Sequence, residues 1–218
     1  MGGDDPGCAT FRRPAQRPRA FRRRVSWPNP TRTRKSPKPP RNSRRFCRRW
    51  ESAVSETIRV ARPGDEAELT AVIHELAEFE RAAHECTVTE NQLREALFGP
   101  EPAVFGHVVE VDGQIAAGAL WFRNFSTWDG VAGIYLEDLF VRPAFRRRGL
   151  ARRLLATLAQ ECVQRGYTRL SWAVLNWNVD AIALYDSVGG AAQDEWTTYR
   201  VSGPRLAELA AESSSGPG

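Results

Sequence analysis

The chain of 218 residues lacks several features that would point to particular classes of protein. It has no run of about 18 or more apolar residues, so we expect no membrane-spanning helix and no membrane partner. Its cysteines form no C-x-x-C pair and show no cysteine–histidine spacing that suggests a zinc site; they are Cys8, Cys47, Cys86 and Cys162. This pattern is typical of a protein of the reducing cytoplasm, and we predict a cytoplasmic protein without a metal centre.

Acidic residues are nearly absent from the beginning of the chain, and lysine is absent from the rest. Residues 1–50 contain 16 Lys+Arg and 2 Asp+Glu, a net charge of +14. The whole chain carries +5, so residues 51–218 carry −9. The only two lysines, Lys35 and Lys38, lie in the basic part. The sequence pI of about 9.4 therefore describes the first 50 residues and not the remainder.

Residues 1–55 are predicted to be a disordered basic tail, because arginine, proline and serine with few aliphatic residues cannot bury enough apolar area to offset the entropy of ordering. No apolar stretch follows the arginine clusters, so we do not expect a secretory signal. One hypothesis is a nucleic-acid arm, in which arginines contact phosphates and aromatic rings stack on bases. The alternative is an extension without function, including a start codon assigned too far upstream. Deleting residues 1–50 and measuring nucleic-acid retention distinguishes the two.

Residues 56–204 are predicted to form one domain, followed by a C-terminal tail at 205–218. Alternating apolar patterns and turn signals predict strands at 57–62, 104–111, 114–125, 133–141 and 169–174, with the last strands within 192–201. Helical spacing predicts helices from about 65 to 80, 90 to 97, 149 to 165 and 179 to 188. Antiparallel strands thus precede a strand–helix–strand crossover, which indicates a mixed α/β sheet.

A short basic loop lies between the strand at 133–141 and the long helix that follows it. A helix N-terminus attracts anions, because it exposes unpaired backbone N–H groups and the positive end of the helix dipole. Small residues in such a loop let a phosphate approach the backbone. The loop therefore predicts a phosphate-bearing ligand, although a solvated arginine run is an equally simple interpretation of the motif by itself. Its residues are Arg146, Arg147, Arg148, Gly149, Leu150 and Ala151.

Around this loop the sequence resembles the GCN5-related N-acetyltransferase (GNAT) superfamily, over about residues 57–203. It is most similar to the spermidine/spermine (diamine) and thialysine acetyltransferase branch. The matching segments are ELAEFE at 75–80, STW at 126–128, IYLED at 134–138, AVLNWN at 173–178 and ALY at 183–185. The resemblance implies a central, mostly antiparallel sheet with a splayed parallel strand pair and flanking helices. It also implies acetyl-CoA as co-substrate and a homodimer.

For the donor side, the resemblance implies that backbone amides of 146–151 bind the CoA pyrophosphate. The strand residues Leu139, Phe140 and Val141 would pair with the pantetheine arm. Asn178 would hydrogen-bond pantetheine, although a plain helix N-cap explains this residue nearly as well. Tyr185 would lie beside the thioester sulfur and act as the general acid; the alternative is a core aromatic on an apolar helix face.

For the acceptor side, the resemblance implies an amine pocket formed by Phe79, Glu80, Trp128, Glu137 and Asp138. Glu137 is the predicted general base. Neighbouring strand residues point to opposite faces, so Glu137 and Asp138 can share a site only if a β-bulge intervenes, as the family has in this strand. Burying charge is costly, which makes both acids functional candidates. The alternative is a structural salt bridge to an arginine.

The sequence therefore predicts an N-acetyltransferase that moves an acetyl group from acetyl-CoA to a primary amine of a small cationic acceptor such as a polyamine or thialysine. The net charge of −9 on residues 51–218 would attract a cation over a distance. One alternative is a protein acetyltransferase that acts on lysines or N-termini. Another is a noncatalytic acyl-CoA-binding protein whose basic tail binds nucleic acid.

Overall fold

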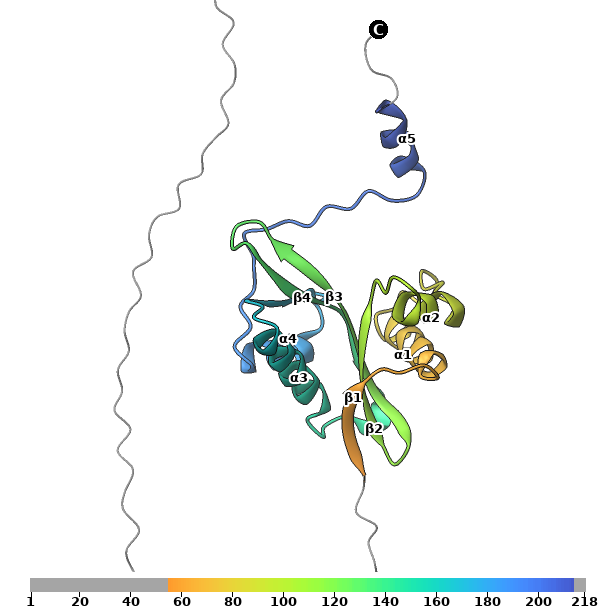
Figure 1. Cartoon of the computed structure of the whole chain (residues 1–218), viewed down its shortest axis with the longest axis vertical. Helices are drawn as coiled ribbons and strands as arrows, with labels where there is room; N and C mark the ends of the chain where they lie inside the picture. The colour runs from red at the N-terminus through yellow and green to blue at the C-terminus, as the bar shows by residue number, and fades with distance from the viewer. Residues whose placement is uncertain (1–54, 214–218) are drawn as a thin grey trace, which may run out of the picture. The chain divides into compact units, whose positions relative to one another are not determined.

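The computed structural model describes residues 55–213, so the hypotheses about the basic tail lie outside the described residues, apart from its last position (Figure 1). Up to α4 (Val179–Ser187), the strands and helices follow one another in the predicted order. In chain order the elements are β1 (Glu56–Val60), α1 (Glu66–Phe79), α2 (Glu90–Phe98), β2 (Phe105–Val111), β3 (Gln114–Ser126), β4 (Val131–Val141), the short 3-10 helix η1 (Pro143–Phe145), α3 (Leu150–Gln164), β5 (Leu170–Trp172), α4 (Val179–Ser187) and α5 (Pro204–Glu212).

The five strands form one sheet in the order β1-β2-β3-β4-β5. Neighbouring strands are antiparallel except for β4 and β5, which run parallel and pair only from Ile134↔Leu170 to Leu136↔Trp172. The sheet is therefore mixed, as predicted. Beyond Leu136, the edge of β4 that faces β5 has no strand beside it among the described residues. The two strands separate there.

Helices cover both faces of the sheet (Figure 1). On one face, α1 and α2 pack Leu69 and Leu93 against Val108 and Leu120 of the sheet. On the other face, α3 contributes a buried row of residues to a second core, which includes Ile134 and Trp121. That row is Leu150, Leu154, Leu155, Leu158 and Cys162. These are the apolar positions that recur at helical spacing in the sequence, and their burial supplies the hydrophobic stabilisation of this layer.

Local sequence signals fix several element boundaries. Thr89 caps α2 with a full capping box, in which its hydroxyl accepts from the Gln92 amide while the Gln92 side chain accepts from the Thr89 amide. Gly166 follows α3 with φ of 69°, the left-handed conformation that ends helices at glycine. The Asn178 side chain caps α4 by accepting from the Ala181 amide at 3.3 Å.

The strands predicted within 192–201 were wrong, because these residues form no strand. Helix α5 begins at Pro204, the last residue of the predicted domain, and continues into the predicted tail at 205–218. The boundary between domain and tail stays a prediction. The sequence of 196–201 is rich in aromatic and β-branched residues, but such residues form a strand only when a neighbouring edge pairs with them. Within residues 55–213 no strand pairs with this segment, and every residue from 191 to 212 is exposed.

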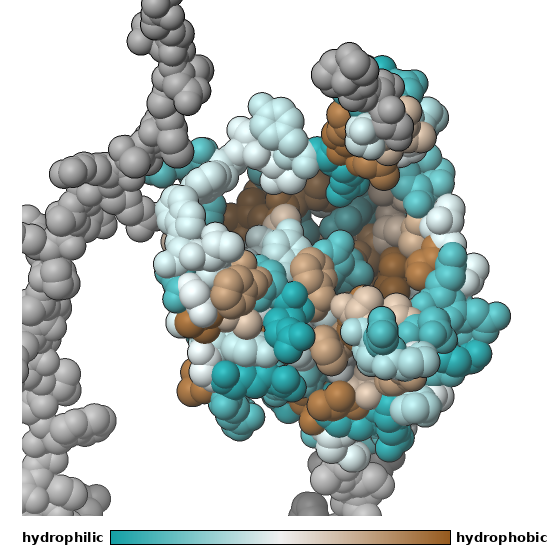
Figure 2. Space-filling model, turned by 45° about the horizontal axis from the view of Figure 1, so that its top comes forward, coloured by the Kyte–Doolittle hydropathy of each residue, from teal (hydrophilic) through white to brown (hydrophobic). Residues whose placement is uncertain are grey.

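No helix among residues 55–213 has the length and apolar character needed to cross a bilayer. On the face seen in Figure 2, hydrophobic and hydrophilic residues are interleaved over the surface.

Candidate active site

A β-bulge in β4 determines how the two neighbouring acids lie. Leu136 pairs with Trp121 and Asp138 pairs with Leu120, so Glu137 is the extra residue without a partner on β3. The expected bulge is therefore present. It breaks the strict alternation of side chains along the strand, and both Glu137 and Asp138 line one pocket.

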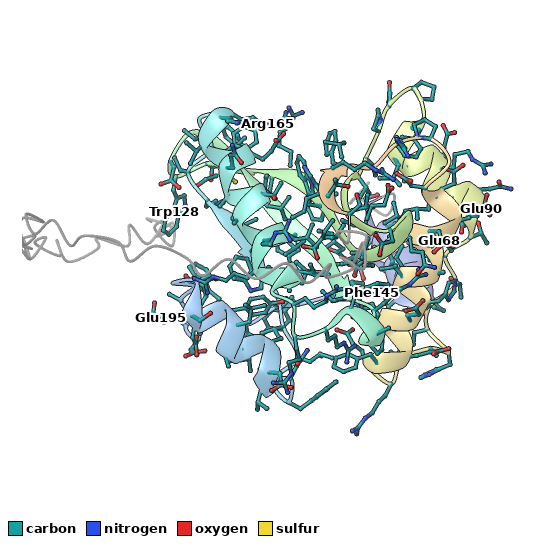
Figure 3. All side chains as sticks on the ribbon, turned by 90° about the horizontal axis from the view of Figure 1, so that it is seen from below. Glu68, Glu90, Trp128, Phe145, Arg165 and Glu195 are labelled. Atoms are coloured by element: carbon teal, nitrogen blue, oxygen red, sulfur yellow. The ribbon has the colours of Figure 1, made fainter. Side chains whose placement is uncertain are left out.

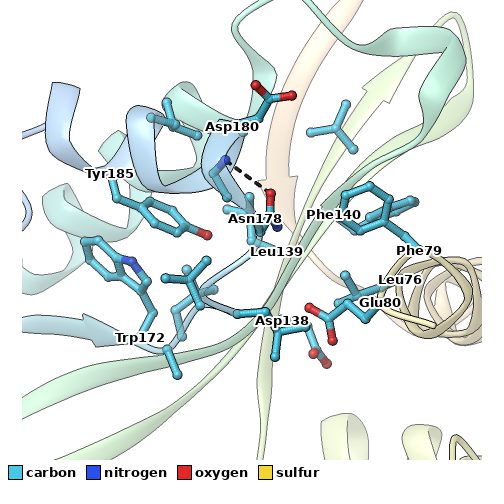
Figure 4. A pocket seen from close by; sticks show the side chains of 18 of the residues that line it. Leu76, Phe79, Glu80, Asp138, Leu139, Phe140, Trp172, Asn178, Asp180 and Tyr185 are labelled. Carbon is cyan, nitrogen blue, oxygen red and sulfur yellow. Dashed lines mark hydrogen bonds between the residues drawn. The ribbon is translucent and has the colours of Figure 1, made fainter. Parts of the chain in front are cut away.

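This pocket has a volume of about 760 Å³ and lies where β4 and β5 separate. Five parts of the chain form its walls: the end of α1, the second half of β4, the loop that leads into α3 together with the first turn of α3, the segment from β5 into α4, and Arg200 from the segment after α4. Figure 4 shows the Tyr185 ring projecting into the pocket from α4, while Glu80 enters from the end of α1 on the side where Asp138 lies. The pocket thus joins segments that lie far apart in the sequence.

One wall of the pocket is acidic. Burial raises the pKa of the Asp138 carboxyl from 3.8 to about 6, and the negative charges of Glu137 and Glu80 add to the rise. Burial also raises the pKa of Glu80. None of the ion pairs within residues 55–213 involves any of these three acids, so the salt bridge considered as an alternative does not form there. The wall is an uncompensated negative site, which favours a bound cation.

Tyr185 faces this acidic wall. Its ring lies 5.0 Å from the ring of Trp172, centroid to centroid. Burial raises the pKa of the Tyr185 hydroxyl, and the charge of Glu80 adds to the effect. The hydroxyl therefore keeps its proton at neutral pH, as a general acid must.

The opposite end of the pocket suits an anion. Arg147 and Gly149 both have positive φ, 63° and 74°, so the backbone turns sharply just before α3 begins. Gly149 is the N-cap of α3 and has no side chain to bond the first amides of the helix. These amides can therefore bind a phosphate oxygen.

The exposed edge of β4 offers a place for an extended chain. Past Leu136 its N–H and C=O groups on the β5 side have no strand partner among the described residues, and Leu139, Phe140 and Val141 line the pocket. The Val141 carbonyl is engaged, because it accepts from Nε of Arg146 at 2.9 Å. The free edge leads from the anion end of the pocket toward the acidic wall, which is the path that a pantetheine arm would follow.

Comparisons with known proteins agree with this geometry. Residues 69–189 match the model of the acetyltransferase (GNAT) family. Thialysine N-epsilon-acetyltransferase of Caenorhabditis elegans is 39% identical over 153 residues, which cover 69% of this chain and 94% of the relative. This chain belongs to the GNAT family. It is an N-acetyltransferase, and members of the family use acetyl-CoA.

Two further comparisons define the range of the GNAT similarity. The L-ornithine N5-acetyltransferase NATA1 of Arabidopsis thaliana is 28% identical over 194 residues, which cover 68% of this chain and 85% of the relative. Among solved structures, an integron cassette protein from the mobile metagenome of V. cholerae superposes with a TM-score of 0.62 at 23% identity, covering 72% of this chain and 99% of the other. The latter likeness concerns the fold.

The GNAT pocket brings together nearly all of the predicted site residues, but it does not include Trp128 or Arg148. Trp128 is 74% exposed in the turn between β3 and β4. Figure 3 shows it well away from Phe145, which lines the pocket. Trp128 therefore does not line this pocket in the single chain, and its role in amine binding stays a prediction. Arg148 is exposed, and only its neighbours Arg147 and Gly149 reach the pocket.

The same GNAT pocket contains residues that the sequence interpretation missed. Arg152 and Asp180 lie in the first turns of α3 and α4, Trp172 is on β5, and Arg200 comes from the segment after α4. Helical spacing could have suggested Arg152, because it lies one turn after the loop at 146–149. Arg200 carries no comparable signal.

Within residues 55–213 no three His, Cys, Asp or Glu side chains are grouped as metal ligands. The expectation of a metal-free reaction stays a prediction.

Proposed function

We propose that this GNAT domain transfers an acetyl group from acetyl-CoA to a primary amine of a small cationic acceptor. The observation that carries the proposal is the combination of one uncompensated acidic wall and one anion-binding helix N-terminus in a single pocket. Donor and acceptor have opposite charges, and the two ends of the pocket differ in the same way. A cavity of about 760 Å³ is also within the usual range for small-molecule sites.

The donor would bind along the anion end and the free edge of β4. The amides at the start of α3 would hold the pyrophosphate, with Arg147 adding positive charge at the pocket wall. The pantetheine arm would extend along Leu139 and Phe140. Asn178 would act mainly as the cap of α4, since its side-chain oxygen accepts from Ala181, while its amide nitrogen is left to contact the arm.

The acceptor would bind at Glu80, Glu137 and Asp138. One of these three carboxylates would take the proton of the reacting amine. The other two would be needed only for an acceptor that carries a further positive charge. Ornithine and thialysine, the acceptors in the names of two relatives, both carry a second amino group. Diamines and amino acids with a side-chain amine are therefore the proposed acceptor class.

The reaction begins with a proton transfer, because a primary amine with a pKa near 10.4 is almost entirely protonated at neutral pH. Glu137 is the proposed base, directly or through water; Asp138 is a second candidate, because its pKa of about 6 suits a base at neutral pH. The amine nitrogen then attacks the acetyl carbonyl carbon, and a backbone N–H near Leu139 stabilises the oxyanion. As the C–S bond breaks, Tyr185 donates its proton to the departing sulfur, and the excess proton on the amide nitrogen returns to the Tyr185 oxygen, directly or through water.

A thiol-release assay tests this function directly. The full chain is mixed with acetyl-CoA and one acceptor at a time: 1,4-diaminobutane, spermidine, ornithine, S-aminoethylcysteine (thialysine) or a lysine-containing peptide. We expect release of free CoA with the small acceptors and at least tenfold less with the peptide. Preferential acetylation of the peptide would replace this proposal by a protein acetyltransferase, and no amine-dependent release would refute it.

We also propose a cytoplasmic homodimer. Among residues 55–213 no further strand pairs with the outer edge of β5, and no residue of β5 or α4 is fully buried. The segment after α4 exposes large apolar side chains, namely Trp196, Tyr199, Val201, Leu206 and Leu209. A second copy could bury both surfaces. Sedimentation velocity should give the mass of two chains at micromolar concentration; a monomer there would contradict the dimer.

A further inference from the structure

Helix α1 ends in an unusual version of a common motif. The Arg81 amide donates to the Glu78 carbonyl at 3.0 Å and the Ala82 amide donates to the Ala77 carbonyl at 2.9 Å, which together form a Schellman motif. The residue after the C-cap must then adopt the left-handed conformation, and glycine usually occupies this position. Here it is Arg81, with φ of 64°. A residue with a Cβ atom is strained in this conformation, so an arginine at this position suggests that its side chain has a specific role.

The arginine lies over an aromatic ring from the other side of the pocket. The Arg81 guanidinium is 5.5 Å from the ring centroid of Trp177. Trp177 also lies 5.7 Å from the ring of Phe79, centroid to centroid. The residues immediately before and after Glu80 therefore both contact one indole.

These contacts join two walls of the site. Phe79 and Arg81 belong to the end of α1, whereas Trp177 belongs to the loop between β5 and α4 and directly precedes the helix cap Asn178. The guanidinium of Arg146 also lies over the Phe79 ring, at 5.1 Å from its centroid. The end of α1 is thus fixed to the loop before α4 and to the loop before α3 at once.

Glu80 lies at the centre of this arrangement. It is half-buried and lines the pocket with Asp138 and Tyr185. A carboxylate without an ion-pair partner in an acidic pocket would turn toward solvent if its backbone were free to move. The backbone at Glu80 is not free in this way, because both neighbours are held by Trp177.

We infer that Arg81 and Trp177 form a clasp across the pocket that positions Glu80 to bind the cationic group of the acceptor. Arg81 and Trp177 are positioning residues, since neither lines the pocket. The inference rests on the proposed function, because it assigns Glu80 to the acceptor and not to the donor.

The decisive variant is Arg81→Gly, because its expected effects on stability and on acceptor binding have opposite signs. Glycine relieves the backbone strain, so the midpoint of thermal unfolding should stay the same or rise by about 2 °C. Loss of the cation–π contact should raise the acceptor KM about fivefold, the equivalent of about 1 kcal/mol. The KM for acetyl-CoA and the kcat at saturating acceptor should change by less than about twofold.

Matched variants separate the clasp from a general effect of the backbone. Asp112, in the turn between β2 and β3, also has a positive φ of 49° and does not line the pocket; Asp112→Gly should leave the acceptor KM unchanged. Trp177→Leu should raise the acceptor KM to the same extent as Arg81→Gly, and the double variant should add little to either. Trp177→Phe keeps an aromatic face and should recover most of the loss.

Two results overturn the inference. An acceptor KM within twofold of the wild type in Arg81→Gly would show that the clasp does not position Glu80. A lower unfolding midpoint together with an unchanged KM would give Arg81 a purely structural role. A wild-type protein that acetylates no amine in the same assay refutes the proposed function itself, and the inference with it, so the two failures are distinguishable.

Discussion

Asp138→Asn should stabilise the protein at alkaline pH while it impairs the reaction. The folded protein raises the pKa of Asp138 from 3.8 to about 6. Between these values the folded protein holds a proton that the unfolded chain has lost, so stability decreases as the pH rises through this window. Above pH 6 the carboxylate is charged in both the folded and the unfolded state. The folded protein then bears the full free-energy cost of burying this charge beside Glu80 and Glu137.

The magnitude follows from the size of this shift. A rise from 3.8 to about 6 corresponds to about 3 kcal/mol at pH 8. Asp138 keeps some exposure to solvent, so we expect asparagine to recover about 2 kcal/mol, or about 4–8 °C in the unfolding midpoint for a domain of this size. At pH 4 the folded carboxyl is already neutral, and the gain should fall below about 0.5 kcal/mol.

Thermal unfolding of the wild type and Asp138→Asn at pH 4 and pH 8 measures this difference. Asp129→Asn, in the exposed turn between β3 and β4, is the matched control and should change the midpoint by less than about 1 °C at either pH. The acceptor kcat/KM of Asp138→Asn should fall at least about tenfold. A variant that is less stable than the wild type at pH 8, or equally stabilised at both pH values, would refute this account of the acidic wall.

Three other substitutions test separate parts of the site. Tyr185→Phe should lower turnover at least about tenfold and leave acetyl-CoA affinity nearly intact; unchanged turnover would remove Tyr185 as the acid. Glu137→Gln should flatten the rise of rate with pH, whereas a wild-type profile would assign the base to Asp138. Gly149→Trp should abolish acetyl-CoA binding in calorimetry, because φ of 74° at this position strains any larger residue and the helix amides would be displaced; retained tight binding would contradict the pyrophosphate loop.

Much of the fold could be predicted because its signals are local. The capping box at Thr89, the cap at Asn178 and the glycine at 166 each place an element boundary through contacts within a few residues. The apolar stripe of α3 was also visible at helical spacing. The strands expected within 192–201 failed for the opposite reason, since a strand depends on a partner edge elsewhere and no sequence pattern identifies that edge.

The candidate site likewise has parts that sequence motifs predict and parts that depend on contacts between distant residues. The acids and Tyr185 were found through family motifs, and the bulge that brings Glu137 and Asp138 into one pocket was expected on the same basis. Trp128 lies outside the pocket of the single chain, and the motif could not show this, because it gives the order of residues and not the distance from a turn to the pocket. The contact between Arg81 and Trp177 joins positions 96 residues apart, so only the folded chain reveals it.

Transfer of a labelled acetyl group tests the central claim most directly. The full chain is incubated with acetyl-CoA labelled with ¹³C at the carbonyl and with ornithine or 1,4-diaminobutane, and the products are followed by NMR. The account predicts one new amide carbonyl, on the side-chain nitrogen of ornithine or on a terminal nitrogen of 1,4-diaminobutane, formed at the rate at which free CoA appears. Release of CoA with label only in acetate, or no transfer to either amine, would contradict it.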